Sequence, residues 1–454
     1  MLAAVLVLAL AQAVPAQGPR TLRAGQGQPY ATPAQAISAA RAGDTVRVAR
    51  GTYRGALSID KRVVVIGEPG AVVDGGGTGS AVTISADSVT LSGFTLRNSG
   101  RSLDTDDAAV KIIRADGCSI RGNRVELSLH GVYLLEADGT RVEGNTIVGD
   151  PVLAEARRGN GVHLFNAHGN RVANNVIRAT RDGIYFAGAN QNLIAGNDVS
   201  RVRYGVHYMY SDDNEFRGNR FTRNAAGAAL MASRRIVFRD NVFSEHVGYR
   251  AYGILLQTAE EVVAERNRIE GNLVGLFVDA SNRGTFRGNT IWGNGIGIDL
   301  TASAEGNLFT GNAIAGNRTP VRKLMGSGEN RWDENGRGNF WGDPAVFDLD
   351  GDGVGERPYR AGEAFSTLAA ERPVLEVFAR TPAARALSWA EEAFPVFGTS
   401  RVEDPRPLAA APDGLLAARD ARDERPRRDA RVGLLLLFPL ALATARRRGR
   451  NQQP

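Results

Sequence analysis

The sequence predicts an all-β fold: a right-handed, single-stranded parallel β-helix in which each coil of about 22 residues contributes three short strands. Two columns of residues predict it, since both recur mostly every 22 positions and share longer steps of 30 and 26. In one, glycines precede an apolar run: Gly131, Gly161, Gly183, Gly205, Gly227, Gly253, Gly275 and Gly297. The other is asparagine: Asn123, Asn145, Asn175, Asn197, Asn219, Asn241, Asn267 and Asn289. In addition, each repeat holds three apolar runs, as at Ile184, Ile194 and Val199.

Strands this short cannot form a stable sheet alone, so each coil must bury its inner face against the next coil. Equivalent residues then stack about 4.8 Å apart along the axis. Stacked asparagine amides can hydrogen-bond to one another, and asparagine tolerates the left-handed backbone of a sharp corner. The asparagine column is therefore predicted to be structural.

The N-terminal part is predicted to direct export and to close the first coil. Residues 1–17 are typical of a signal peptide, because an apolar stretch is followed by the Ala-x-Ala spacing of Ala11 and Ala13. No lysine or arginine precedes that stretch. The β-helix is predicted to span residues 20–345. Within it, residues 32–42 are expected to form a short amphipathic helix that caps the open edge. The predicted location of the folded body is outside the cytoplasm.

Three segments are predicted to follow the coils. Residues 346–400 comprise an Asp/Gly loop and a helical segment, and residues 401–431 are expected to be a disordered linker because Arg, Asp, Ala and Pro dominate them. Residues 432–454 hold an apolar run, too short for a full membrane span, that ends in arginines. The arginines favour the cytoplasmic side. We expect an anchor or a sorting tail, with an incidental apolar segment as the alternative.

Charge and cysteine content narrow the function classes. The net charge is +6 and the pI about 9.6, but much of the excess lies near the C-terminus. No basic stripe runs through the predicted coils, which argues against a nucleic-acid partner. The single cysteine, Cys118, allows no intrachain disulfide and is expected in the core beside Ile120.

The first strand of each repeat is predicted to present an uncharged outer face. Side chains alternate along a strand, and the outward positions carry aromatic, aliphatic, His and Met residues where a solvated sheet would carry charges. Such a strip is typical of a contact surface. Cover by C-terminal helices is the alternative. The predicted interaction surface comprises Tyr133, Phe165, Tyr185, Leu255 and Phe277.

The same face holds a candidate copper site. Met209 and Met231 are 22 residues apart and should stack directly, and His163 and His207 lie on neighbouring outward positions. Thioether and imidazole ligands suit Cu(I). Insertions near residues 98–108, 149–159 and 244–251 border this face. His130 and His168 are expected at solvated turns, and His246 lies in an insertion.

A second candidate metal site follows the coils. Asp348, Asp350 and Asp352 have the alternating spacing of a calcium loop. The twelfth position of that loop is Tyr359, where a bidentate Glu is usual. A tight Asp/Gly turn without calcium is the alternative.

Three segments resemble the NosD family of nitrous oxide reductase maturation proteins. They are Asn-Phe-Trp-Gly-Asp with the loop of residues 347–359, the segment 382–397, and Gly-Asp-Thr-Val-Arg-Val-Ala-Arg-Gly-Thr-Tyr at 43–53. The resemblance covers roughly residues 20–405. It implies a periplasmic, non-enzymatic protein that passes copper during assembly of the copper–sulfur centre of nitrous oxide reductase. The implied partners are an ABC transporter membrane subunit, a copper chaperone lipoprotein and the reductase.

Two other functions use the same kind of solenoid. A polysaccharide lyase, epimerase or hydrolase needs carboxylates clustered with a base, and Asp182, Asp212 and Asp213 are not expected to form a column with one. A non-catalytic glycan-binding solenoid could stack sugars on Tyr133 and Tyr185.

Overall fold

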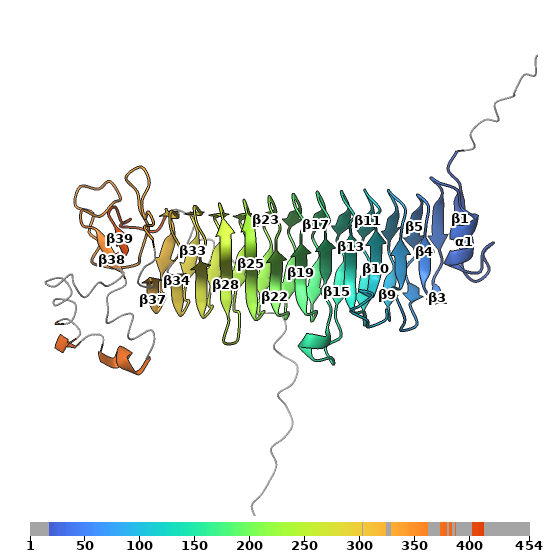
Figure 1. Cartoon of the computed structure of the whole chain (residues 1–454), viewed down its shortest axis with the longest axis horizontal. Coiled ribbons are helices and arrows are strands. Elements are labelled where there is room, and N and C mark those ends of the chain that lie inside the picture. The colour runs from blue at the N-terminus through green and yellow to red at the C-terminus, as the bar shows by residue number, and fades with distance from the viewer. Residues whose placement is uncertain are drawn as a thin grey trace, which may run out of the picture.

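The computed structural model describes residues 18–301, 303–323, 328–361, 373–378, 381–383, 386 and 402–412. Its coils stack into a rod with α1 (Pro33–Ala39) at one end and β38 (Tyr359–Ala361) and β39 (Val402–Asp404) at the other (Figure 1). Three parallel sheets run along the rod, and each strand pairs with its equivalent in the next coil. The predicted all-β parallel β-helix is confirmed.

Sheet 1 has thirteen strands: β1 (Thr21–Ala24), β2 (Thr45–Val48), β5 (Val64–Gly67), β8 (Thr90–Ser92), β11 (Ser119–Arg121), β14 (Arg141–Glu143), β17 (Arg171–Ala173), β20 (Leu193–Ala195), β23 (Glu215–Arg217), β26 (Val237–Arg239), β29 (Val263–Glu265), β32 (Thr285–Arg287) and β35 (Leu308–Thr310). Sheet 2 has twelve: β4 (Leu57–Ile59), β7 (Val82–Ile84), β10 (Ala108–Ile113), β13 (His130–Leu135), β16 (Val162–Phe165), β19 (Asp182–Ala187), β22 (Tyr204–Met209), β25 (Ala226–Arg234), β28 (Tyr252–Glu260), β31 (Val274–Asp279), β34 (Ile296–Leu300) and β37 (Thr319–Lys323). Sheet 3 also has twelve: β3 (Gly51–Arg54), β6 (Ala71–Asp74), β9 (Thr95–Arg97), β12 (Arg124–Glu126), β15 (Thr146–Val148), β18 (Val176–Arg178), β21 (Asp198–Ser200), β24 (Arg220–Thr222), β27 (Val242–Ser244), β30 (Arg268–Glu270), β33 (Thr290–Trp292) and β36 (Ala313–Ala315). The predicted first strand of each repeat lies in sheet 2.

The core is a continuous apolar column inside the rod. Valine, isoleucine and leucine fill the middle coils, and phenylalanines stack along the axis further on. The rings of Phe216 and Phe238 lie 4.8 Å apart, and those of Phe286 and Phe309 lie 4.7 Å apart. Cys118 is buried, as predicted. Because each coil contacts only its neighbours, the apolar column is what makes the stack stable.

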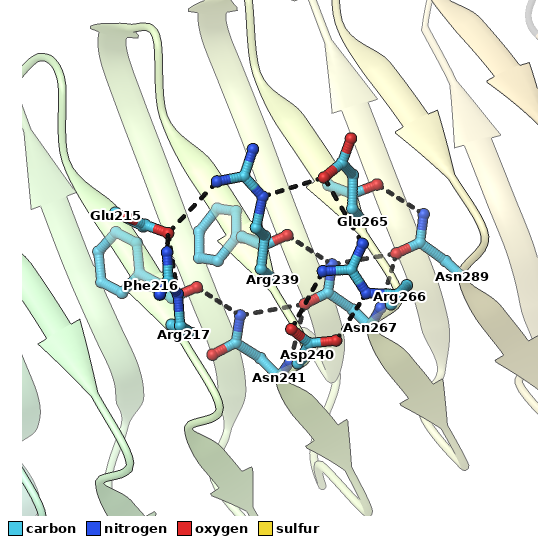
Figure 2. A network of polar contacts seen from close by, with 12 residues as sticks. Glu215, Phe216, Arg217, Arg239, Asp240, Asn241, Glu265, Arg266, Asn267 and Asn289 are labelled. Carbon is cyan, nitrogen blue, oxygen red and sulfur yellow. Dashed lines mark hydrogen bonds and ion pairs between the residues drawn. The ribbon is translucent and has the colours of Figure 1, made fainter. Parts of the chain in front are cut away.

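The asparagine column forms a buried hydrogen-bonded ladder, which confirms its structural role. Asn241 donates from Nδ2 to the carbonyl of Phe216 at 2.9 Å and to Oδ1 of Asn267 at 3.0 Å. Figure 2 shows this pattern continuing from Asn267 to Asn289. Each amide also accepts from the backbone N–H of the preceding member, as Asn267 does from Asn241. The polar groups at this corner are thereby satisfied away from water.

Sheet 1 carries charges on its outer face. Arg239 contacts Glu265 at 3.0 Å and Glu215 at 3.4 Å, and Arg266 contacts Asp240 at 2.9 Å (Figure 2). This is the pattern of a solvated sheet. The middle of sheet 2 lacks it, as described below.

The N-terminal cap follows from local sequence. Thr32 accepts a hydrogen bond from the backbone N–H of Gln35, whose side chain reaches back to the N–H of Thr32. This capping box starts α1. The helix buries Ala36 and Ile37 against the first coils. The predicted cap helix is therefore present, with shorter bounds than the predicted 32–42.

The far end is closed by a returning strand. β39 pairs antiparallel with β38, and the fully buried Asp404 accepts from the backbone N–H of Asn339 at 2.7 Å and from the indole N–H of Trp341 at 2.9 Å. The asparagine ladder thus ends on a carboxylate. The predicted disordered linker is wrong for residues 402–412, because the hydrogen bonds of Asp404 and the burial of Val402 and Leu408 order this segment.

Several predictions fall wholly or partly outside the described residues. They concern the signal peptide, the linker beyond residue 412, the apolar tail and most of the helical segment after the coils. Of that segment, the structure describes a 3-10 helix, η2 (Pro373–Phe378). In the part of the chain that is described, no helix combines the length and apolarity needed to cross a bilayer.

Candidate functional site

Aromatic rings form a row on the outer face of sheet 2 in the middle of the rod. The register pairs Tyr133 with His163, His163 with Tyr185, and Tyr185 with His207. The ring centroids of these pairs lie 4.4, 4.5 and 4.9 Å apart, in tilted or edge-on contact. The predicted outward column is therefore confirmed as a continuous stack.

The two methionines form a second row beside the first. Met209 and Met231 are direct partners in the ladder, as predicted, and both are half-buried. The hydroxyl of Tyr185 donates to Sδ of Met209 at 3.8 Å. His207 lies two residues before Met209 on β22, so imidazole and thioethers belong to one face.

Asp182, at the start of β19, supports this face with no exposed surface of its own. Its Oδ2 lies 2.9 Å from Nδ1 of His207, and Arg203 donates to both carboxylate oxygens at 2.9 and 2.7 Å. Burial alone would raise the pKa of Asp182, but the hydrogen bonds from His207 and Arg203 outweigh it and lower that pKa. Asp182 is therefore charged at neutral pH.

The prediction that Asp182 does not line up with a base is wrong, because His207 contacts it. Asp182 pairs in register with Tyr204, the residue before Gly205. The rings of Tyr204 and His207 lie only 5.0 Å apart, although strict alternation would point residues three apart to opposite sides. The chain bends at the glycine, so the residue before it joins the outer face.

We expect Asp182→Ala to lower the free energy of unfolding by about 2–3 kcal/mol, because it leaves the mostly buried guanidinium of Arg203 without its carboxylate. Urea denaturation measures the change. Asp213→Ala is the matched control, since Asp213 pairs with Arg235 on the exposed surface. Its cost should stay below about 1 kcal/mol. Equal costs for the two variants would contradict this assignment.

His163 does not join His207 in one site. Tyr185 separates the two histidines in the ladder, so they lie two steps apart, about 9–10 Å along the axis. His163 is buried, its Nδ1 lies 3.3 Å from Nδ2 of Asn160, and its Nε2 has no hydrogen-bond partner among the described residues. Of the four predicted copper ligands, His207, Met209 and Met231 are therefore neighbours, whereas His163 lies apart from them.

His130 is buried, so its predicted place at a solvated turn is wrong. It lies before Gly131 and joins the outer face by the same bend, with its ring 5.3 Å from that of His163. Its Nδ1 accepts from the backbone N–H of Asn160 at 3.0 Å. Burial lowers the pKa of His130 to about 4, with smaller effects of Lys111 and other charges. His130 is therefore neutral at pH 7.

The predicted interaction surface is only partly exposed. Phe165 is 38% exposed, whereas Tyr185, Leu255 and Phe277 are half-buried. Tyr133 is 3% exposed and is no surface residue. The insertion before β10 helps to cover Tyr133. Its Asp106 lies 3.9 Å from Nε2 of His130, and burial together with Asp106 raises the pKa of the Tyr133 hydroxyl. A contact surface on sheet 2 therefore starts after Tyr133.

The three insertions end in exposed apolar side chains at the corner before sheet 2. These are Leu103 in the first, Val152 in the second, and Val247 and Tyr249 in the third. The second, which contains the 3-10 helix η1 (Glu155–Arg157), projects from the side of the rod between β15 and β16 (Figure 1). The insertions thus border the face, as predicted.

The Asp/Gly loop forms a cluster that differs from the predicted one. Oxygen atoms of Asp348, Asp350 and Glu356 lie within 4.8 Å of one another, whereas Asp352 is not in the group. Glu356 was missed because the alternating run of aspartates ends at Asp352, and Val354 interrupts the series before Glu356. Asp348 accepts from the backbone N–H of Gly351 at 2.6 Å, as in a tight turn. Calcium binding stays a prediction.

The comparison with known proteins decides the family. A family model described as periplasmic copper-binding protein (NosD) matches residues 143–346, and a model of unknown function, DUF1565, matches residues 16–234. A probable ABC transporter binding protein NosD from Pseudomonas aeruginosa is 42% identical over 80% of this chain and 88% of its own length. The chain belongs to the NosD family. A second NosD of the same description, from Stutzerimonas stutzeri, is 40% identical over 81% of this chain and 87% of its own length.

Among solved structures, the pre-mature gene product 12 of bacteriophage phi29 is similar in fold. It has a TM-score of 0.52 at 13% identity, and the match covers 65% of this chain and 48% of that one. This likeness shows the solenoid alone. The resemblance to NosD predicted from residues 43–53 and 339–397 is confirmed by the relatives, and the family is periplasmic and described as copper-binding.

Proposed function

We propose that this protein is a non-enzymatic periplasmic maturation factor that holds Cu(I) in transit while the copper–sulfur centre of nitrous oxide reductase is assembled. It would act with an ABC transporter and a copper chaperone lipoprotein. The observation that carries the proposal is the pair of stacked thioethers, Met209 and Met231, beside His207 on one face. The description of the relatives as ABC transporter binding proteins supports the transporter partner.

The chemistry of the donors suits copper in its reduced state. Thioether sulfur and imidazole nitrogen are ligands that Cu(I) prefers over hard cations. The contact of Asp182 with Nδ1 favours the tautomer of His207 in which Nε2 carries the free lone pair. A carboxylate behind a ligating imidazole also orients the ring and raises its basicity. Asp182 is therefore a positioning residue for His207.

The surroundings suit a metal that must leave again. Met209, Met231 and His207 are half-buried, so a partner protein can reach the site. The charge of Asp182 is balanced by Arg203, so the site adds little net attraction for a cation. Thioether and imidazole ligands without a shell of carboxylates or thiolates would bind Cu(I) with moderate affinity. Moderate affinity is needed if the copper is to pass to a partner protein.

Anaerobic titration of Cu(I) against a chromogenic competitor such as bicinchoninate tests the proposal on the full chain. We expect about one Cu(I) per chain, and at least a 100-fold loss of affinity in Met209→Leu with Met231→Leu, because leucine keeps the volume and removes both sulfurs. Asp182→Asn should weaken binding by about 10- to 100-fold through the outer shell.

Met325→Leu is the matched control, because it leaves both thioethers of the row in place. Its affinity should equal that of the unmodified protein. Unchanged Cu(I) uptake in the double methionine variant would refute the site. Absence of Cu(I) uptake by the unmodified protein would refute the function.

A carbohydrate-active enzyme is the second candidate, favoured by the cluster of Asp182, Arg203 and His207 beside Tyr185. An acid–base group must reach the proton that it transfers. Asp182 has no exposed surface, which argues against the enzyme. Turnover of polygalacturonate or alginate, followed by product absorbance at 235 nm, would favour it. Binding of these polymers without turnover would favour the glycan-binding solenoid.

A further inference from the structure

A groove lined by arginines lies on the outer face of sheet 3, away from the methionine row. It encloses about 540 Å³ and runs across strands β12, β15 and β18. The outward residues of the middle coils are small or apolar, namely Thr146, Val148 and Val176, while Arg124 and Arg178 stand at either side. The groove exists because short side chains in the ladder are flanked by long ones.

The second insertion forms one wall. Pro151 contributes to the lining, and Arg158 donates to the carbonyls of Leu153 at 2.8 Å and Pro151 at 3.0 Å. These bonds fix the base of the insertion next to the groove. Hydrogen bonds within the insertion therefore hold this wall of the groove in place without a partner.

The lining carries a positive charge that Glu126 and Asp198, just outside it, offset in part. Four arginines line the groove, and none of its lining residues is acidic. Two of the arginines have neighbours outside the lining, since Arg124 contacts Glu126 and Arg178 lies 3.6 Å from Asp198. The contact at 3.6 Å joins two partly exposed groups and is weak. The arginines thus keep donors for a ligand.

Two of the arginines have guanidinium donors that no described residue accepts. Nε of Arg178 is buried and has no hydrogen-bond partner in the described part of the chain. The side chain of Arg201, which is exposed, makes no hydrogen bond or ion pair to any described residue. A buried guanidinium donor without an acceptor costs free energy, so a bound carboxylate would relieve it.

We propose that the groove binds an acidic, extended segment of a partner protein. The arginines favour an anionic ligand. The floor of Val148, Val176 and Pro151 favours a ligand that also carries apolar side chains. Alternating glutamate and aliphatic residues on an extended chain satisfy both, since neighbouring side chains point to opposite sides. A single small anion would leave most of the 540 Å³ unfilled. The apolar floor lies recessed between arginines, so an extended chain can reach it, whereas the flat headgroup surface of a bilayer cannot.

Isothermal titration of the full chain with a blocked hexapeptide of alternating leucine and glutamate tests the proposal. We expect micromolar binding at low ionic strength, and at least tenfold weaker binding of the matching leucine–glutamine peptide. Arg178→Gln with Arg201→Gln should lower the affinity for the acidic peptide at least tenfold. Arg201→Gln alone, at an exposed position, should lower it about threefold and cannot be dismissed as a folding defect.

Arg235→Gln and Arg266→Gln are matched controls, because these arginines lie in exposed ion pairs elsewhere on the rod. Their affinity for the peptide should be unchanged. Equal binding of inorganic phosphate and peptide would make the groove a small-anion site and overturn the proposal. Arginine-dependent binding to phosphatidylglycerol vesicles without peptide binding would make it a lipid site and also overturn it. The Cu(I) titration of the arginine variants should match the unmodified protein, so this proposal and the copper site fail independently.

Discussion

Asn219→Ala should lower the free energy of unfolding by roughly 3–6 kcal/mol, an exceptional effect for one buried amide. The side chain accepts from the backbone N–H and the amide of Asn197, both at 2.9 Å, and donates to the carbonyl of Ile194 at 2.8 Å. It also donates to Oδ1 of Asn241 at 2.9 Å. Alanine would leave several buried polar groups without partners, each costing about 1–3 kcal/mol.

Equilibrium denaturation in urea, followed by circular dichroism at 218 nm, measures this effect. Gln257→Ala is the matched control, because Gln257 is an exposed amide with one hydrogen bond, to Asp279 at 3.3 Å. Its effect should stay within about 0.5 kcal/mol. A loss below 1 kcal/mol in Asn219→Ala would show that the corner does not depend on the ladder.

Acidification from pH 6.5 to 5.0 should destabilise the protein by about 3 kcal/mol through His130 and His246 together. Burial lowers the pKa of His130 to about 4 and that of His246 to about 3, below the ordinary 6.5. Between pH 6.5 and 5.0 these histidines therefore bind more protons in the unfolded chain than in the folded chain. Stability is complete above pH 6.5 and falls as the pH drops toward the folded pKa values. His163, whose pKa burial also lowers, adds to the loss.

The variant His246→Asn tests this assignment within the fold. His246 occupies a position of a second ladder, since its Nδ1 accepts from the N–H of Asn224 at 3.2 Å and its N–H donates to Asn272 at 3.2 Å. Asparagine should fit there, because the next members of the ladder are asparagines. We expect stability near the original at pH 7.5 and a smaller loss at pH 5.0, measured by urea midpoints. Identical pH slopes would contradict the role of His246.

Asp182 does not contribute to this pH window. Its pKa is lowered in the folded state by His207 and Arg203, against the effect of burial. Its contribution is present above the ordinary aspartate pKa of about 3.9 and is lost only as the pH falls below that value. A loss of stability between pH 6.5 and 5.0 therefore reports on the buried histidines.

Periodicity predicted the residues that the ladder places in register. Met209 and Met231, or Tyr185 and His207, become partners because a coil of 22 residues returns each position above its equivalent. The buried asparagine column was predictable for the same reason. These predictions needed only the repeat length and the alternation of side chains along a strand.

The bend at the repeated glycine was not predictable from alternation. It brings Asp182 and His130 onto the outer face, where they meet His207 and His163. The sequence could have offered one signal, because His, Asn, Asp and Tyr occupy the position before the glycine in four successive coils. These residues are too polar to face the core and too varied to form a hydrogen-bonded ladder of identical side chains, which indicates a position on the outer face.

Repeat length by itself determined the coil, the three sheets, the asparagine ladder and the stacking of the two methionines, because these follow from which residues are one turn apart. Only the tertiary structure decided which outward residues are buried, how Arg203 and His207 meet Asp182, and that Asp404 returns to close the last coil. Those contacts depend on bends, insertions and segments distant in sequence. A repeat fixes the order of neighbours along the rod, whereas side-chain direction and covering loops fix the chemistry of its faces.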